Sequence, residues 1–179
     1  MSEPVKVELG AGKRKMAGWI GIDISDAADI QCDLSRSPLP FPDESVDEIY
    51  SSHFLEHFSH QQLVAHVLPE CLRILKAGGV FRAAVPDASI YIAAYIKGEP
   101  FPEVIPVYKK AYFFDAPLDS LNYIAYMAGE HKHMFDKDNL LALLRNNGFA
   151  DVALRKFDPA IDIEKRRPQS LYCIASKKS

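Results

Sequence analysis

The chain has 179 residues, the usual size of one domain and long enough to bury a sizeable core. Its net charge of −3 argues against nucleic acid as a partner, because phosphate binding relies on a basic surface. The odd number of widely spaced cysteines favours free thiols over a disulfide framework or zinc knuckle. With no long apolar segment, we expect a cytoplasmic protein without membrane insertion, whose oligomeric state the sequence leaves open.

The N-terminal stretch predicts a strand followed by a tight turn. Val5, Val7 and Leu9 alternate with polar residues, Gly10-Ala11-Gly12 follows, and the next apolar run, 19–22, ends at Asp23. Glycines let the backbone approach a ligand closely, and a carboxylate at this place can accept hydrogen bonds from a ribose diol. This stretch therefore favours a nucleotide-type site.

The linker between the first two strands, 13–18, is too short for a full helix, so one loose turn is expected there. A helix should begin at His60, because Ser59 and Gln62 form a capping-box pattern. Pro69 should kink or split that helix, and Gly78-Gly79 should end it. Short apolar runs predict the remaining strands at 30–32, 46–52, 80–85, 152–157 and 171–175.

Residues 87–130 differ in character from the rest of the chain. They hold nine of the nineteen aromatic residues, together with several prolines. We interpret them as a cap inserted into a single domain that spans 1–179. Most of the aromatic rings should pack the cap onto the core, and a few could face a substrate.

Regular structure should resume with a helix after Asp136, a good N-cap residue, and Asn147-Gly148 should end it. The last two strands have no helix between them and should pair antiparallel. Alternating strands and helices with this final pair predict an open α/β sheet. Four candidate ligand residues, Gly10, Asp23, Asp33 and Ser52, lie just past strand ends, where such sheets bind ligands.

The chain resembles class I S-adenosylmethionine-dependent methyltransferases of the methyltransferase-11-like group. The matching pieces are VELGAG, GWIGIDIS, CDLSRSPLPFPDESVDEIYSSHFLEHF, ECLRILKAGGVFRAAVPD, EHKHMFDKDNLLALLRNNGF and SLYCIASK, in family order over nearly the whole chain. The resemblance implies a Rossmann-like, mostly parallel seven-stranded sheet with an antiparallel last strand. The family's third glycine is absent, since Lys13 and Arg14 follow Gly12.

The resemblance also implies a cofactor, S-adenosylmethionine, and residues that hold it. Glu8 and the Gly10-Ala11-Gly12 backbone would bind the methionine part, and Asp23 would accept from both ribose hydroxyls. Asp33 would accept from the adenine amino group. The other residues assigned to cofactor binding are Ile24, Leu34 and Ser52.

His53 and His57 follow the fourth strand, at the place of the family's methyl pocket, and are the candidate catalytic residues. His53 could take the proton of an acceptor hydroxyl if its pKa lies near neutrality. With Glu56, the two histidines could instead bind a divalent metal, although we favour a metal-free site. Residues 53–57, His-Phe-Leu-Glu-His, also match H-x-x-E-H, a peptidase motif that requires a helix through these residues.

His131, His133 and Arg166 are candidate substrate-binding residues. The two histidines could reach the pocket from the end of the cap or form a solvated pair, and Arg166 could hold an anionic group or belong to a solvated charge run.

No Asn-Pro-Pro-Tyr or Asp-Pro-Pro-Tyr follows the fourth strand. With the acidic charge, this absence favours methyl transfer to a small molecule, such as a hydroxyl on a sugar or lipid-linked metabolite. Two alternatives remain. One is a non-catalytic relative that binds the cofactor or a partner. The other is a dinucleotide oxidoreductase, which would need a glycine where Lys15 stands.

Overall fold

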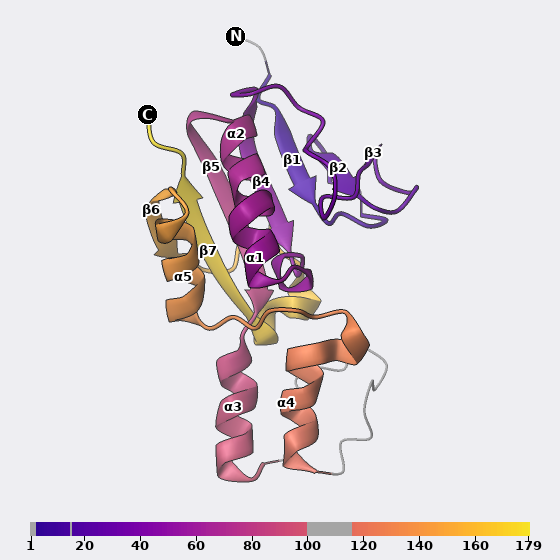
Figure 1. Ribbon diagram of the computed structural model, residues 1–179, viewed down its shortest axis with the longest axis vertical. Helices are drawn as coiled ribbons and strands as arrows, with labels where there is room; N and C mark the ends of the chain where they lie inside the picture. The colour runs from indigo at the N-terminus through magenta and orange to yellow at the C-terminus, as the bar shows by residue number, and fades with distance from the viewer. Residues whose placement is uncertain (1–2, 15, 100–115) are drawn as a thin grey trace.

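The computed structural model describes residues 3–14, 16–99 and 116–179. Its centre is a seven-stranded sheet in the order β3-β2-β1-β4-β5-β7-β6, shown in Figure 1. Strands β1 to β5 are parallel, and β7 is antiparallel to both of its neighbours. The strands are β1 Lys6–Leu9, β2 Ile20–Asp23, β3 Ile30–Gln31, β4 Val46–Ser52, β5 Leu75–Pro86, β6 Ala150–Leu154 and β7 Ser170–Ser176. The predicted sheet is thus confirmed, antiparallel last strand included.

The order of the strands creates a switch point between β1 and β4. From β1 the chain runs outward through β2 and β3, then returns to pair β4 with the other edge of β1. Parallel sheets bind ligands outside the carboxyl ends of their strands at such a point. The residues that follow these ends are Gly10 after β1 and His53 after β4.

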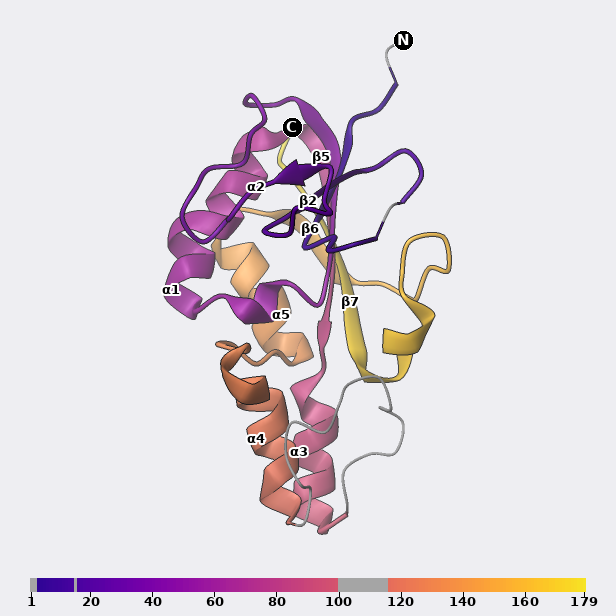
Figure 2. The same ribbon diagram turned by 90° about the vertical axis from the view of Figure 1, so that its right-hand side faces the viewer.

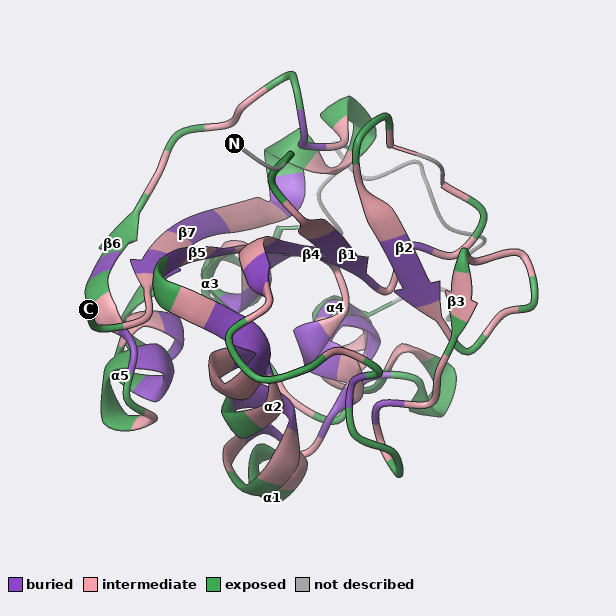
Figure 3. Cartoon of the chain, turned by 90° about the horizontal axis from the view of Figure 1, so that it is seen from above, coloured by how far each residue is buried: buried purple, intermediate pink, exposed green. Residues whose placement is uncertain are grey.

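Helices cover one face of the sheet, as Figures 2 and 3 show. They are α1 His60–Gln62, the π-helix η2 Leu63–Val67, α2 Leu68–Ile74 and α5 Lys137–Asn146. Ser59 caps α1 through the predicted capping box with Gln62. Pro69 lies in the first turn of α2, and the break expected there takes the form of the π-helical turn that precedes it.

One predicted boundary is wrong. The helix was expected to reach Gly78-Gly79, but α2 ends at Ile74 and both glycines lie inside β5. Leu75 pairs with Val46, and the register between β4 and β5 shifts before Glu48 pairs with Val80. The glycines therefore lie beside an irregularity in a strand and do not form a helix cap.

The opposite face lacks a helix where the chain links β1 to β2, because the described residues of 13–18 form only turns, as expected. Residues 155–169 lie against this face instead (Figure 2). Buried polar contacts fix them: Arg155 donates to Asp162 at 2.6 Å, and the Tyr50 hydroxyl donates to the same carboxylate at 3.0 Å. Arg14 donates to the Ile161 carbonyl at 2.6 Å.

The cap region projects beyond the carboxyl ends of the strands as two helices, α3 Ala88–Lys97 and α4 Pro117–Tyr126 (Figure 1). The short helix η3, Met127–Gly129, follows α4. The two long helices share a small apolar cluster, separate from the main core, which contains Tyr91 and Tyr123. Five aromatic residues assigned to the cap lie outside the described residues: Phe101, Tyr108, Tyr112, Phe113 and Phe114.

Candidate active site

The larger of two neighbouring cavities, about 360 Å³, lies at the carboxyl ends of β1, β2 and β4. We call it the cofactor cavity. Its size falls within the usual range for sites of small molecules. The predicted site residues that line it are Gly10, Asp23, Ile24, Asp33, Leu34, His53 and His57. The structure therefore brings together residues from four separate segments of the chain.

The turn after β1 requires glycine. Gly10 and Gly12 have φ angles of +70° and +56°, which side chains other than glycine adopt with strain. A Cβ atom on Gly10 would lie 2.5 Å from Cδ2 of Phe54, whereas one on Gly12 would meet no atom of the described residues within 4 Å. The nearby Phe54 ring therefore leaves no room for a side chain at Gly10, and the positive φ disfavours a side chain at both positions.

Two carboxylates at the cavity are held by neighbouring donors. Asp23 accepts from the Gly12 amide at 2.9 Å and from the Ser25 amide at 2.9 Å. Each carboxylate oxygen has two lone pairs, so both can still accept from a ligand. The Ser35 hydroxyl and amide hydrogen-bond Asp33 and hold the pKa of its carboxyl below the usual value.

Four other residues assigned to the cofactor do not line this cavity: Glu8, Ala11, Gly12 and Ser52. Glu8 is buried, and its Oε1 accepts from Arg14 at 3.1 Å. Burial raises the pKa of Glu8, although the charge of Arg14 opposes this shift. Ser52 instead accepts a hydrogen bond from Arg166.

A second cavity of about 190 Å³ adjoins the first, and His53 and His57 line both. We call it the acceptor cavity. Its other lining residues come from the region after β4, the end of β5, the cap with the residue that follows it, and the segment before β7: Glu56, Pro86, Tyr91, Tyr123, Ile124, Met127, His131, Arg166 and Gln169. The two candidate catalytic histidines therefore stand at the boundary of two neighbouring spaces.

The hydrogen bonds of His53 define its tautomer. The Ser170 hydroxyl donates to the Arg166 carbonyl at 2.6 Å, so it can only accept from His53 Nε2, 2.7 Å away. The lone pair is then on Nδ1. Burial, followed by the charge of Arg166, holds the pKa of His53 well below its ordinary value. The expectation of a pKa near neutrality is wrong, because the side chain is removed from water.

The peptidase alternative fails on local structure. It required a helix through 53–57, but His53 has a φ of +50° and only Leu55–His57 are helical, as the 3-10 helix η1. Glu56 is fully buried, and its Oε2 has no hydrogen-bond partner among the described residues. Burial raises the pKa of Glu56 to about 8.

The three candidate substrate residues have different environments. Arg166 donates from Nη1 to the Ser52 carbonyl at 2.7 Å and lines the acceptor cavity. His131 is buried and lines the same cavity, so the solvated pair is wrong for this residue. His133 lines neither cavity; it contacts Asn139 at 3.1 Å and stacks on His60.

Several lining residues were not assigned from the sequence. Tyr91 and Tyr123 belong to the cap aromatics of which a few were expected to face a substrate. Phe54 and Phe58 follow β4 and pack edge to face at 4.9 Å, and no pattern marked them as lining residues. Gln169 carries no sequence signal, because only the fold brings it to the cavity.

A family model described as a methyltransferase domain matches residues 8–83, from β1 into β5. The chain carries an S-adenosylmethionine-dependent methyltransferase domain. The expected resemblance is thereby confirmed, and the cofactor expectation with it. No curated protein matches the chain.

Solved structures share the fold of this methyltransferase at low sequence identity. A SAM-dependent methyltransferase from Archaeoglobus fulgidus is 17% identical, with a TM-score of 0.60, covering 97% of this chain and 86% of the other. One from Methanosarcina mazei is 18% identical, with a TM-score of 0.61 and coverage of 99% and 94%. One from Mesorhizobium loti is 20% identical, with a TM-score of 0.60 and coverage of 98% and 92%.

In the described part of the methyltransferase, no helix has the length and apolar character to cross a membrane.

Proposed function

We propose that the protein transfers a methyl group from S-adenosylmethionine to a small molecule, at a hydroxyl of a sugar or lipid-linked metabolite. The observation that carries this proposal is the pair of adjoining cavities with His53 and His57 between them. A transferase must hold two reactants side by side in a fixed orientation, which lowers the entropic part of the barrier.

The residues of the cofactor cavity fit S-adenosylmethionine. Gly10 lines the cavity without a side chain, so the backbone can come close to a ligand, and Asp23 retains lone pairs for a ribose diol. Asp33 would accept from the adenine amino group, beside Leu34. When bound, the cofactor supplies an electrophilic methyl group. The protein's own part is to align the acceptor and to receive its proton.

His53 can receive the proton of the acceptor through its Nδ1, which carries a lone pair. Burial keeps this imidazole neutral, so the lone pair is available at neutral pH, and Ser170 fixes its Nε2. The lowered pKa makes His53 a weaker base than a histidine of ordinary pKa, so its part depends on its position beside the acceptor. A hydroxyl acceptor needs such a base as its oxygen takes the methyl group. An acceptor that carries an anionic group would also suit Arg166, whose two bonds to Ser52 both come from Nη1.

A screen of metabolites with cofactor labelled on its methyl group tests the proposal. We expect label on a hydroxyl compound of small size, and none on DNA, RNA or protein. Label only on nucleic acid or protein would refute the small-molecule assignment, and label on an amine nitrogen would refute the hydroxyl.

His53→Asn should lower the single-turnover rate about 100-fold or more, the usual contribution of a general base. Asparagine tolerates the positive φ of this position, so the backbone should be retained. The matched control is His133→Asn, which changes a histidine outside both cavities. If His53→Asn kept the full rate on the identified acceptor, His53 would not be the base.

The cap should act as a lid over both cavities, which amide hydrogen exchange can test. In the described part of the cap, helices α3 and α4 pack on each other through a small apolar cluster separate from the main core, and Gly129 and Glu130 at the end of the cap line the cofactor cavity. We expect amides of both helices to exchange faster than those of β4 and β5, and to slow when S-adenosylhomocysteine is added. Equal, unchanging protection of the helices and strands would make the cap a fixed part of the core.

A further inference from the structure

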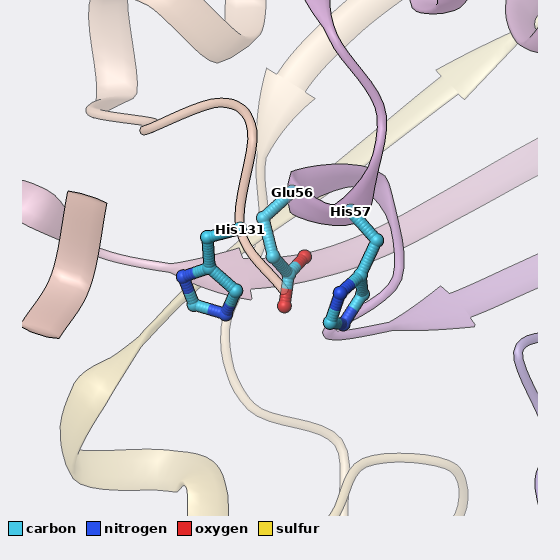
Figure 4. Close-up of side chains that lie close together, drawn as sticks. All are labelled: Glu56, His57 and His131. Atoms are coloured by element: carbon cyan, nitrogen blue, oxygen red, sulfur yellow. The ribbon is translucent and has the colours of Figure 1, made fainter. Parts of the chain in front are cut away.

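Three potential metal ligands converge beside the acceptor cavity: Glu56, His57 and His131 (Figure 4). One ligand atom from each lies within 4.8 Å of the other two. Glu56 and His57 belong to η1, whereas His131 comes from the far end of the cap. The Lys132 amide donates to the Glu56 carbonyl at 2.8 Å, which holds the segment of His131 against η1.

The carboxylate of Glu56 is incompletely satisfied in this cluster. Its Oε2 is buried without a hydrogen-bond partner among the described residues, and its Oε1 lies 4.0 Å from His53 Nδ1, too far for a hydrogen bond. A buried carboxyl oxygen without a partner costs free energy and is rare in folded proteins. A cation bound between Glu56 and the neighbouring imidazoles would satisfy it.

Backbone carbonyls orient both histidines. Nδ1 of His57 lies 2.9 Å from the Glu130 carbonyl, and Nδ1 of His131 lies 2.9 Å from the Ile124 carbonyl. A carbonyl only accepts, so both Nδ1 atoms carry the proton and each Nε2 retains its lone pair. Histidines that bind metals usually have their second ring nitrogen fixed in this way.

We propose that Glu56, His57 and His131 bind a divalent transition-metal ion of the zinc type. Two imidazoles and one carboxylate suit zinc better than magnesium, which prefers oxygen ligands. In a tetrahedral site with bonds of about 2.1 Å, ligand atoms lie about 3.4 Å apart. The separations of up to 4.8 Å must therefore shorten by about 1.4 Å, within the reach of side-chain rotations.

Three protein ligands leave the fourth position of such an ion open, as in catalytic zinc sites. All three residues line the acceptor cavity, so the open position would face the acceptor and polarise its oxygen. This role rests on the proposed methyl transfer, but the binding of the ion does not. The sequence had grouped His53 with Glu56 and His57, whereas the cluster of potential ligands in the structure contains His131 instead of His53.

Zinc titration of untagged protein, stripped with a chelator and followed by calorimetry, tests the site. We expect one zinc ion per chain. Glu56→Gln and His131→Ala should each weaken binding by at least about 100-fold, since loss of an outer partner alone costs about 10–100-fold. The matched control is His133→Ala, two residues from His131 and outside the cluster, which should bind zinc like the wild type.

The same preparations are titrated with S-adenosylhomocysteine to show that each variant is folded and to separate this proposal from the methyltransferase function. Wild-type protein that binds S-adenosylhomocysteine but no zinc at micromolar concentration would overturn the metal site alone. Equal zinc affinity in wild type, Glu56→Gln and His131→Ala would overturn it too.

X-ray absorption of zinc-loaded wild-type protein keeps the proposal testable even if the variants fail to fold. We expect nitrogen and oxygen neighbours at about 2.0–2.2 Å. A sulfur neighbour at about 2.3 Å would assign the ion to a free cysteine and overturn the proposed site.

Discussion

Asp23→Ala should weaken the binding of S-adenosylmethionine and S-adenosylhomocysteine by about 2–3 kcal/mol, or roughly 30- to 150-fold. The side chain ends β2 at the edge of the cofactor cavity, where the amides of Gly12 and Ser25 hold it in place. Hydrogen bonds from the ribose to this charged acceptor would be lost. Isothermal titration of wild type and variant measures the difference.

Two other aspartates provide the comparison. Asp26→Ala changes an exposed carboxylate outside both cavities and should leave the affinity unchanged. Asp33→Ala should cost less than Asp23→Ala, because the packing of the adenine remains. An Asp23→Ala affinity within twofold of wild type would contradict the ribose assignment, and a larger loss for Asp33→Ala would mean that the two roles are reversed.

Gly10→Ala should reduce cofactor affinity more than tenfold and destabilise the fold by about 1–3 kcal/mol. The new Cβ would lie 2.5 Å from Phe54 at a φ of +70°. Phe54 lines the cofactor cavity and packs on Phe58, so moving it deforms the cavity wall. Denaturant unfolding and titration with S-adenosylhomocysteine measure the two effects.

Gly98→Ala separates backbone strain from the close contact. Gly98 has a φ of +66°, nearly that of Gly10, but in the part of the chain that the structure describes its Cβ would meet no atom within 4 Å, and it lies at the end of α3. We expect a stability loss of about 1–2 kcal/mol with cofactor affinity unchanged. Equal affinities for Gly10→Ala and wild type would show that the turn after β1 does not contact the cofactor.

Most of the fold could be predicted because local signals agree with it. The strand 46–52 and the helix after Asp136 were found at their true positions, since apolar pattern and cap residues mark them. The start of β5 was missed because Leu75 continues the helical apolar stripe and Gly78-Gly79 resembles a helix end. Pairing with β4 outweighs that local preference, and no single-segment pattern contains this information.

The site was predicted where residues follow strand ends and missed where distant segments meet. Asp23 ends the parallel strand β2 and Asp33 comes shortly after the parallel strand β3, so the topology alone brings them together. The burial of His131 and the position of Gln169 depend on how the cap and the segment before β7 pack against η1 and β4. The lowered pKa of His53 follows from burial in the same packing, and the residues next to it in the sequence, Ser52 and Phe54, do not reveal that burial.

The most direct test of the central claim is titration of the wild-type protein with S-adenosylhomocysteine and, separately, with NAD. A methyltransferase with this cofactor cavity should bind one S-adenosylhomocysteine per chain and no NAD. Binding of NAD without S-adenosylhomocysteine would instead support a dinucleotide oxidoreductase, and binding of neither would support a non-catalytic relative; either result would contradict the account.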